Sequence, residues 1–121
     1  MDFMIQEYRQ ATDRRANLRH PAQIEIQWEG AAGKQPGTIS DLGRGGCFVL
    51  CSGAVENGEK VKLYFSVESN KNNLLKGEGV DHFNEIGFAV RFVELSETDE
   101  LFLNHLLYHL TQVNRSLKKG R

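Results

Sequence analysis

The sequence predicts an all-β core followed by one long α-helix. Short segments with strand-like patterns recur from residue 22 to residue 93, and turn-forming residues separate them. After residue 96 the spacing of apolar residues changes to that of a helix. The chain has 121 residues, of which 40% are hydrophobic and 26% charged, so its size and composition suit one globular domain.

The first strand has the clearest pattern. Residues 22–29 alternate apolar and polar side chains, which indicates one buried face and places Trp28 in the core or at its rim. The following segments are predicted as a turn at 30–37, strands at 38–42, 47–50, 60–67, 74–81 and 86–93, a glycine-rich break at 43–46, and turns at 57–58 and 70–73. About six short strands separated by turns favour an antiparallel barrel or a sandwich, and a closed barrel leaves no exposed edge.

The C-terminal helix is predicted over residues 97–115. Ser96 offers an N-cap, and acidic residues in the first turn suit the helix dipole. One side of the helix carries a wide apolar stripe, formed by Phe102, Leu103, Leu106, Leu107, Leu110 and Val113. This stripe is expected to cover a barrel mouth, to form a homodimer with a second copy, or to do both.

Charge and composition exclude several classes of protein. The net charge is −1, which argues against nucleic acid as the partner. No segment approaches the ~18 apolar residues of a membrane span, and the first residues lack the apolar run of a signal peptide. With only two cysteines, Cys47 and Cys51, the expected setting is a reducing cytoplasm.

Two local elements carry the candidate chemistry. Arg15 and Arg19 lie four residues apart with Arg14 adjacent, and guanidinium groups bind phosphate and guanine edges through paired hydrogen bonds. In the segment from Asp41 to Gly46, three glycines allow close backbone approach, and a carboxylate can accept from guanine N–H donors. Taken singly, the first is better explained as an exposed basic arm. The second is at least as well explained as a bulge or corner of a barrel strand.

Taken together, Arg15-x-x-x-Arg19 and the later Asp41-x-x-x-x-Gly46 resemble the signature of the PilZ domain family. That signature is Arg-x-x-x-Arg followed by Asp/Asn-x-Ser-x-x-Gly. Residues 77–80 and 86–92 look like the closing hairpin of the family, so the resemblance covers roughly residues 12–113. Arg14 matches a frequent extra arginine, whereas Gly43 stands where the family has serine.

The resemblance implies a six-stranded antiparallel β-barrel that binds the bacterial second messenger cyclic di-GMP. The implied ligand-binding residues are Arg14, Arg15, Arg19, Asp41, Gly43 and Gly46. Residues 14–115, including the helix at 97–115, would form the domain, preceded by a flexible or short helical arm at 1–13 and followed by a basic tail at 116–121. The implied function is a cytoplasmic bacterial receptor, connected with motility or biofilm formation, that relays the messenger level to an unknown protein effector when the arginine segment becomes ordered.

Other chemistries find less support in the sequence. We expect no enzyme, because no nucleophile–base pair and no paired catalytic carboxylates stand in a recognisable context. We expect no metal or cofactor either: Cys47 and Cys51 are too few for a zinc site, and His105 and His109 are expected to pack at a helix edge. The main alternative is a degenerate PilZ domain that acts as a protein–protein adaptor without nucleotide, which the glycine at position 43 would favour.

Overall fold

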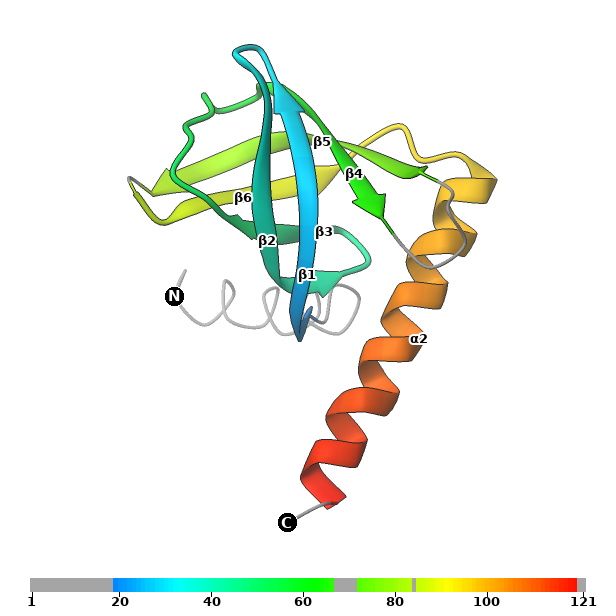
Figure 1. Cartoon of the computed structure of the whole chain (residues 1–121). Coiled ribbons are helices and arrows are strands. Elements are labelled where there is room, and N and C mark those ends of the chain that lie inside the picture. The colour runs from blue at the N-terminus through cyan, green and yellow to red at the C-terminus, as the bar shows by residue number, and fades with distance from the viewer. Residues whose placement is uncertain (1–18, 67–71, 84, 120–121) are drawn as a thin grey trace, which may run out of the picture.

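The computed structural model describes residues 19–66, 72–83 and 85–119. Six antiparallel strands close into a barrel in the order β1-β2-β3-β6-β5-β4, and one helix follows (Figure 1). The elements are β1 (Arg19–Gly30), β2 (Gly33–Gly43), β3 (Gly46–Leu50), β4 (Lys60–Ser66), β5 (Asn72–Phe83), β6 (Gly87–Phe92) and α2 (Glu97–Lys119). This architecture confirms the predicted fold class and decides between the barrel and the sandwich.

The hairpin of β1 and β2 is longer than predicted. The turn expected at residues 30–37 is wrong, because Lys34, Gln35 and Pro36 already pair with β1 and only residues 31–32 form the turn. Pro36 is tolerated in this strand because the pairing of β2 with β3 begins only at Thr38, so no partner strand needs an N–H on that side. Pro36 and Gly37 therefore lie inside β2 rather than in a loop.

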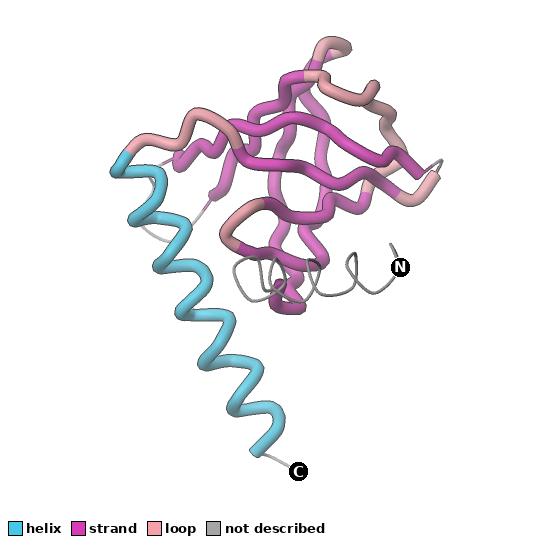
Figure 2. Tube along the Cα trace, turned by 180° about the vertical axis from the view of Figure 1, so that it is seen from behind, coloured by secondary structure: helices cyan, strands magenta, loops and turns pink. Residues whose placement is uncertain are grey.

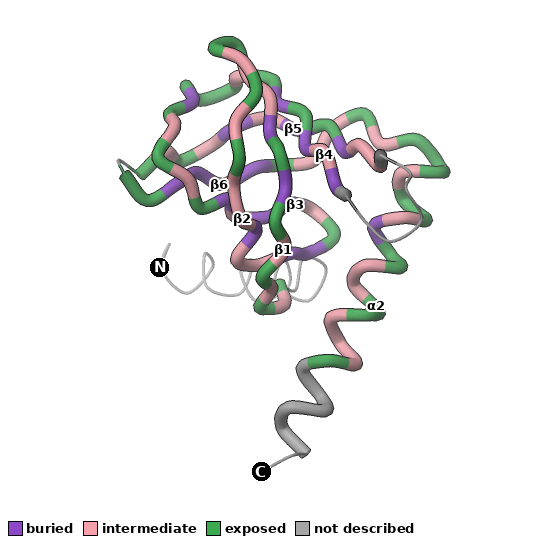
Figure 3. Tube along the Cα trace, in the orientation of Figure 1, coloured by how far each residue is buried: buried purple, intermediate pink, exposed green. Residues whose placement is uncertain are grey.

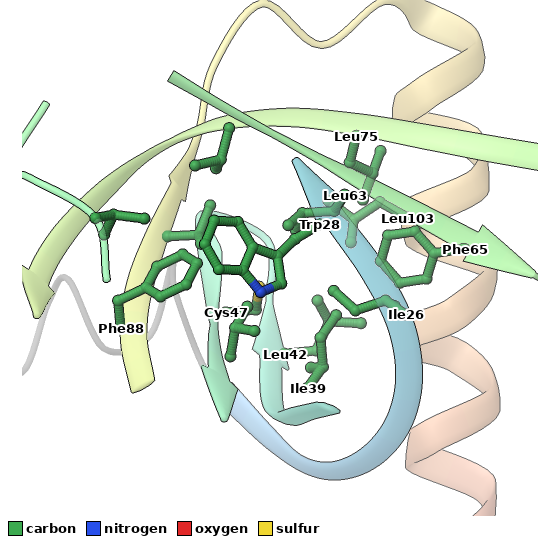
Figure 4. Packing of buried hydrophobic residues seen from close by; sticks show 14 residues of the cluster. Ile26, Trp28, Ile39, Leu42, Cys47, Leu63, Phe65, Leu75, Phe88 and Leu103 are labelled. Atoms are coloured by element: carbon green, nitrogen blue, oxygen red, sulfur yellow. The ribbon is translucent and has the colours of Figure 1, made fainter. Parts of the chain in front are cut away.

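The core fills the inside of the barrel (Figure 4). Trp28 is buried, as predicted, and packs edge-on against Phe88 with ring centroids 4.8 Å apart. Cys47 is also fully buried, which confirms it as a small core residue. Burial raises the pKa of the Cys47 thiol far above its ordinary value, so this cysteine stays protonated and unreactive.

The helix α2 begins with a reciprocal cap. The Ser96 hydroxyl oxygen accepts from the backbone N–H of Asp99, and the Asp99 carboxylate accepts from the backbone N–H of Ser96, each at 3.0 Å. Leu103 is buried in the core, and Phe102 packs edge-on against Phe65 of β4. The first turns of α2 therefore cover the barrel next to β1 and β5, as the apolar stripe predicted.

The helix extends well past this contact. It ends at Lys119, four residues beyond the predicted end at residue 115. Figures 1 and 2 show from opposite sides that its C-terminal half leads away from the barrel. Within the part of the chain that the structure describes, this helix is not long and apolar enough to cross a membrane.

Candidate functional site

Asp41 owes its outward orientation to a β-bulge. Ile39 pairs with Val49 and Asp41 pairs with Phe48, so Ser40 is an extra residue in β2. As a result, two fully buried residues of β2, Ile39 and Leu42, are three positions apart rather than two. Without this extra residue the alternation of the strand would turn Asp41 into the core.

The carboxylate of Asp41 pairs with Arg19, the first residue of β1. Arg19 Nη1 lies 2.8 Å from Asp41 Oδ1, and the two side chains are 42% and 37% exposed. The antiparallel pairing of β1 with β2 places the start of β1 beside the end of β2, with Arg19 opposite Gly43 and Pro21 opposite Asp41. The structure therefore brings together one member of each predicted element, although they are 22 residues apart in sequence.

Gly43 lies directly opposite Arg19 in the β1–β2 pairing. Side chains of directly opposed residues point to the same face of a sheet. A serine at position 43 would thus carry its hydroxyl on the face that holds Arg19 and Asp41. Arg14 and Arg15, the other two predicted ligand-binding arginines, lie outside the described residues.

Gly46 has a structural reason to be glycine. It pairs with Arg91 of β6, and a β-carbon at Gly46 would lie only 2.0 Å from the carbonyl oxygen of Val90. The neighbouring Gly45 accepts a hydrogen bond from the N–H of Phe92 at 2.9 Å, which holds the turn against β6. The close approach of two backbones is thus sufficient to explain the last glycine of the turn.

The surface beside Asp41 is apolar, which the sequence did not reveal. Phe48 is the cross-strand partner of Asp41, and Ala89 of β6 is the next residue in the same row. Residues 47–50 are all apolar, so their pattern gave no sign of which side chains face outward. The structure shows that Cys47 and Val49 are buried, so Phe48 and Leu50 are the outward ones.

The structure describes no metal-binding cluster. Among residues 19–66, 72–83 and 85–119, no three histidine, cysteine or acidic side chains converge on one point. His105 and His109 are exposed on α2, so the expected packing of these side chains at the helix edge is wrong. The residues of α2 that pack against the core are Phe102, Leu103, Leu106, Leu107 and Leu110. His105 and His109 lie on the opposite side of the helix.

Comparison with known proteins defines the class of this domain. The family model of the PilZ domain matches residues 13–109, and the chain belongs to this family. PilZ domains are typically non-catalytic receptor domains. No curated protein matches the chain significantly.

Solved structures show the same fold. The PilZ domain of YcgR from Escherichia coli, solved with c-di-GMP, has a TM-score of 0.73 and 18% identity, and the match covers 89% of this chain and 99% of that one. The PilZ domain of CeSA from a cellulose-synthesizing bacterium gives 0.63 and 22%, covering 77% and 97%. The motility inhibitor MotI of Bacillus subtilis gives 0.60 and 21%, covering 89% of this chain and 54% of that one.

Proposed function

We propose that this PilZ domain is a receptor for cyclic di-GMP. The observation that carries the proposal is the ion pair of Arg19 with Asp41 on the outer face of the barrel, next to Gly43. The E. coli YcgR domain with which it shares its fold was solved with c-di-GMP. A calorimetric titration with cyclic di-GMP tests the proposal.

The two side chains have complementary roles toward such a ligand. The guanidinium of Arg19 can donate paired hydrogen bonds to a phosphate or to the O6/N7 edge of a guanine. The carboxylate of Asp41 can accept from the N1–H and N2–H₂ donors of the same base. Arg14 and Arg15 precede Arg19 closely in sequence and would supply further positive charge for the phosphates.

The ion pair of Arg19 with Asp41 does not prevent the ligand from binding. Arg19 and Asp41 are both more than a third exposed, and exposed pairs contribute only about 0–1 kcal/mol to stability. Hydrogen bonds to charged groups contribute about 1.5–3 kcal/mol. A ligand that bonds to both side chains therefore offsets the loss of their mutual contact, and in its absence the pair keeps the two groups in place.

Gly43→Ser is expected to tighten binding about five-fold. The variant adds one hydroxyl on the face that holds Arg19, and a hydrogen bond is worth about 1 kcal/mol net. Gly43→Ala is the matched control, because it adds the β-carbon without the hydroxyl. Equal dissociation constants for the serine and alanine variants would show that position 43 contributes no hydrogen bond to the ligand.

The relay to a protein partner is proposed to run through α2. Leu101 and Tyr108 lie seven residues apart on one side of this helix and are 71% and 65% exposed. The acidic first turn and the basic last residues of the helix give it opposite charges at its two ends, which favours antiparallel pairing with a second copy. The same surface could serve a protein effector in the bacterial cytoplasm, for example in motility or biofilm control.

Sedimentation analysis checks the self-association of α2. We expect a dimer that dissociates in the variant Leu101→Glu/Tyr108→Glu, because two charges would be buried in the helix interface. The control variant Gln23→Glu/Gln27→Glu adds the same charge at exposed positions of β1 and should leave the dimer intact. A wild-type monomer throughout the concentration series would leave α2 free for a different protein.

A further inference from the structure

The outer face of the barrel carries an apolar patch that the proposed ligand does not account for. The structure describes six large hydrophobic residues that are exposed, and they fall into two groups. One group lies on α2. The other lies where β3 meets the hairpin of β5 and β6, and it comprises Leu50, Phe83 and Ile86, which are 40%, 50% and 56% exposed.

These side chains form one continuous surface with Phe48. The rings of Phe48 and Phe83 have centroids 5.9 Å apart, and Leu50 and Phe83 both pair with Gly87 of β6. The backbone N–H of Cys51 donates to the carbonyl of Ile86 at 3.0 Å, which fixes Ile86 beside the end of β3. We call Phe48, Leu50, Phe83 and Ile86 the β3–β6 patch. Figure 3 shows that the chain is exposed at the tip of the hairpin of β5 and β6.

The β3–β6 patch adjoins the point where the N-terminal segment enters the barrel. Phe48 is the cross-strand neighbour of Asp41, and Asp41 pairs with Arg19, where β1 begins. Adjacent strands are about 4.8 Å apart, so Phe48 lies roughly two strand spacings from Arg19. The 18 residues before Arg19 would span roughly 60 Å if extended, or about 27 Å as a helix, so they can reach every part of the patch.

The composition of that segment matches the patch. Phe3, Met4, Ile5 and Tyr8 stand close together within residues 1–18. Arg9 follows them, and two exposed acids, Asp81 and Glu85, are close in sequence to Phe83 and Ile86. An apolar cluster followed by a cation thus has within its reach an apolar surface with acidic residues near it in the chain.

We propose that the N-terminal residues 3–8 of this chain bind to the β3–β6 patch on the same barrel. This docking does not require the ligand. Cyclic di-GMP, if bound as proposed above, would hold the arginines against Asp41 and so raise the fraction of molecules in which the segment is docked.

Photo-crosslinking tests the docking in the full chain. The photoreactive analogue p-benzoylphenylalanine replaces Tyr8, and mass spectrometry locates the crosslink. A mixture of ¹⁴N- and ¹⁵N-labelled protein separates crosslinks within one chain from those between two. The same analogue at the exposed Tyr108 of α2 is the matched control.

We expect crosslinks within one chain to peptides containing Phe48, Leu50, Phe83 or Ile86, and none of these from position 108. The variant Phe83→Ser/Ile86→Ser should reduce the yield several-fold, whereas Leu101→Ser on α2 should not; all three positions are exposed, so the fold tolerates the changes. Crosslinks between two chains, crosslinks elsewhere on the barrel, or a yield insensitive to Phe83→Ser/Ile86→Ser would overturn the proposal.

The experiment is run with and without cyclic di-GMP, which separates this inference from the proposed function. A crosslink that forms equally in both conditions supports the docking and shows that cyclic di-GMP does not raise the docked fraction. A failure to crosslink in protein that binds cyclic di-GMP by calorimetry overturns the docking and leaves the receptor function standing.

Discussion

Gly46→Ala is expected to destabilise the folded barrel by more than about 3 kcal/mol. The added methyl group would lie 2.0 Å from the carbonyl oxygen of Val90, and both partners are backbone atoms held by the β3–β6 pairing. Neither strand can move away without breaking the closure of the barrel, since β3 connects β2 to β6. Chemical denaturation followed by tryptophan fluorescence measures the change, because Trp28 is in the core.

Gly30→Ala is the control for this result. Its added methyl group would meet side-chain atoms rather than backbone, namely Glu59 Oε2 at 2.5 Å and a ring carbon of Trp28 at 3.1 Å. Moving Glu59 weakens the hydrogen bonds that it accepts from the N–H groups of Ala31 and Glu56, so we expect a loss of about 1–2 kcal/mol, smaller than that of Gly46→Ala. A Gly46→Ala protein as stable as the wild type would show that β3 and β6 are not as close as the structure has them. The role of this glycine would then have to be sought in ligand binding alone.

The double variant Arg15→Ala/Arg19→Ala is expected to weaken cyclic di-GMP binding at least about 100-fold. Each arginine would lose charge-assisted hydrogen bonds worth about 1.5–3 kcal/mol, and two such losses exceed the ~2.7 kcal/mol of a 100-fold change. Stability should change little, because the ion pair of Arg19 with Asp41 is exposed. Calorimetric titration measures the affinity, and thermal unfolding confirms that the variant is folded.

Lys62→Ala/Lys76→Ala is the charge-matched control. These lysines lie opposite each other in the pairing of β4 with β5, and both are exposed. Neither β4 nor β5 pairs with β2, which holds Asp41, or with β3. The variant removes two positive charges, as the arginine variant does. An equal loss of affinity in the arginine variant and the lysine variant would mean that binding depends only on the total charge of the protein. That result would rule out binding through specific arginines.

The sequence predicted the succession of strands along the chain and the helix after them, because alternation and apolar spacing follow directly from burial. The prediction failed where a residue type occurs in more than one kind of structure. Pro36 and the glycines around it marked a turn in sequence but lie in or beside the long β1–β2 hairpin. Along residues 47–50 every side chain is apolar, so only the structure separates the buried Cys47 and Val49 from the outward Phe48 and Leu50.

The candidate site was predictable in its parts but not in its geometry. The motif spacing brought Arg19 and Asp41 into one hypothesis, and the structure places them 2.8 Å apart. The bulge at Ser40 that turns Asp41 outward has no marker in the sequence, since it depends on how β2 is paired with β3. The reason for glycine at position 46 also lies in a contact with Val90, 44 residues further along the chain.

Titration calorimetry of the wild-type protein with cyclic di-GMP tests the central claim most directly. We expect saturable heat with cyclic di-GMP and much weaker binding of cyclic di-AMP, because adenine lacks the N1–H and N2–H₂ donors that Asp41 would accept. The heat should disappear in Arg15→Ala/Arg19→Ala and persist in Lys62→Ala/Lys76→Ala. No heat from the folded wild-type protein, or equal affinity for both dinucleotides, would contradict the receptor function.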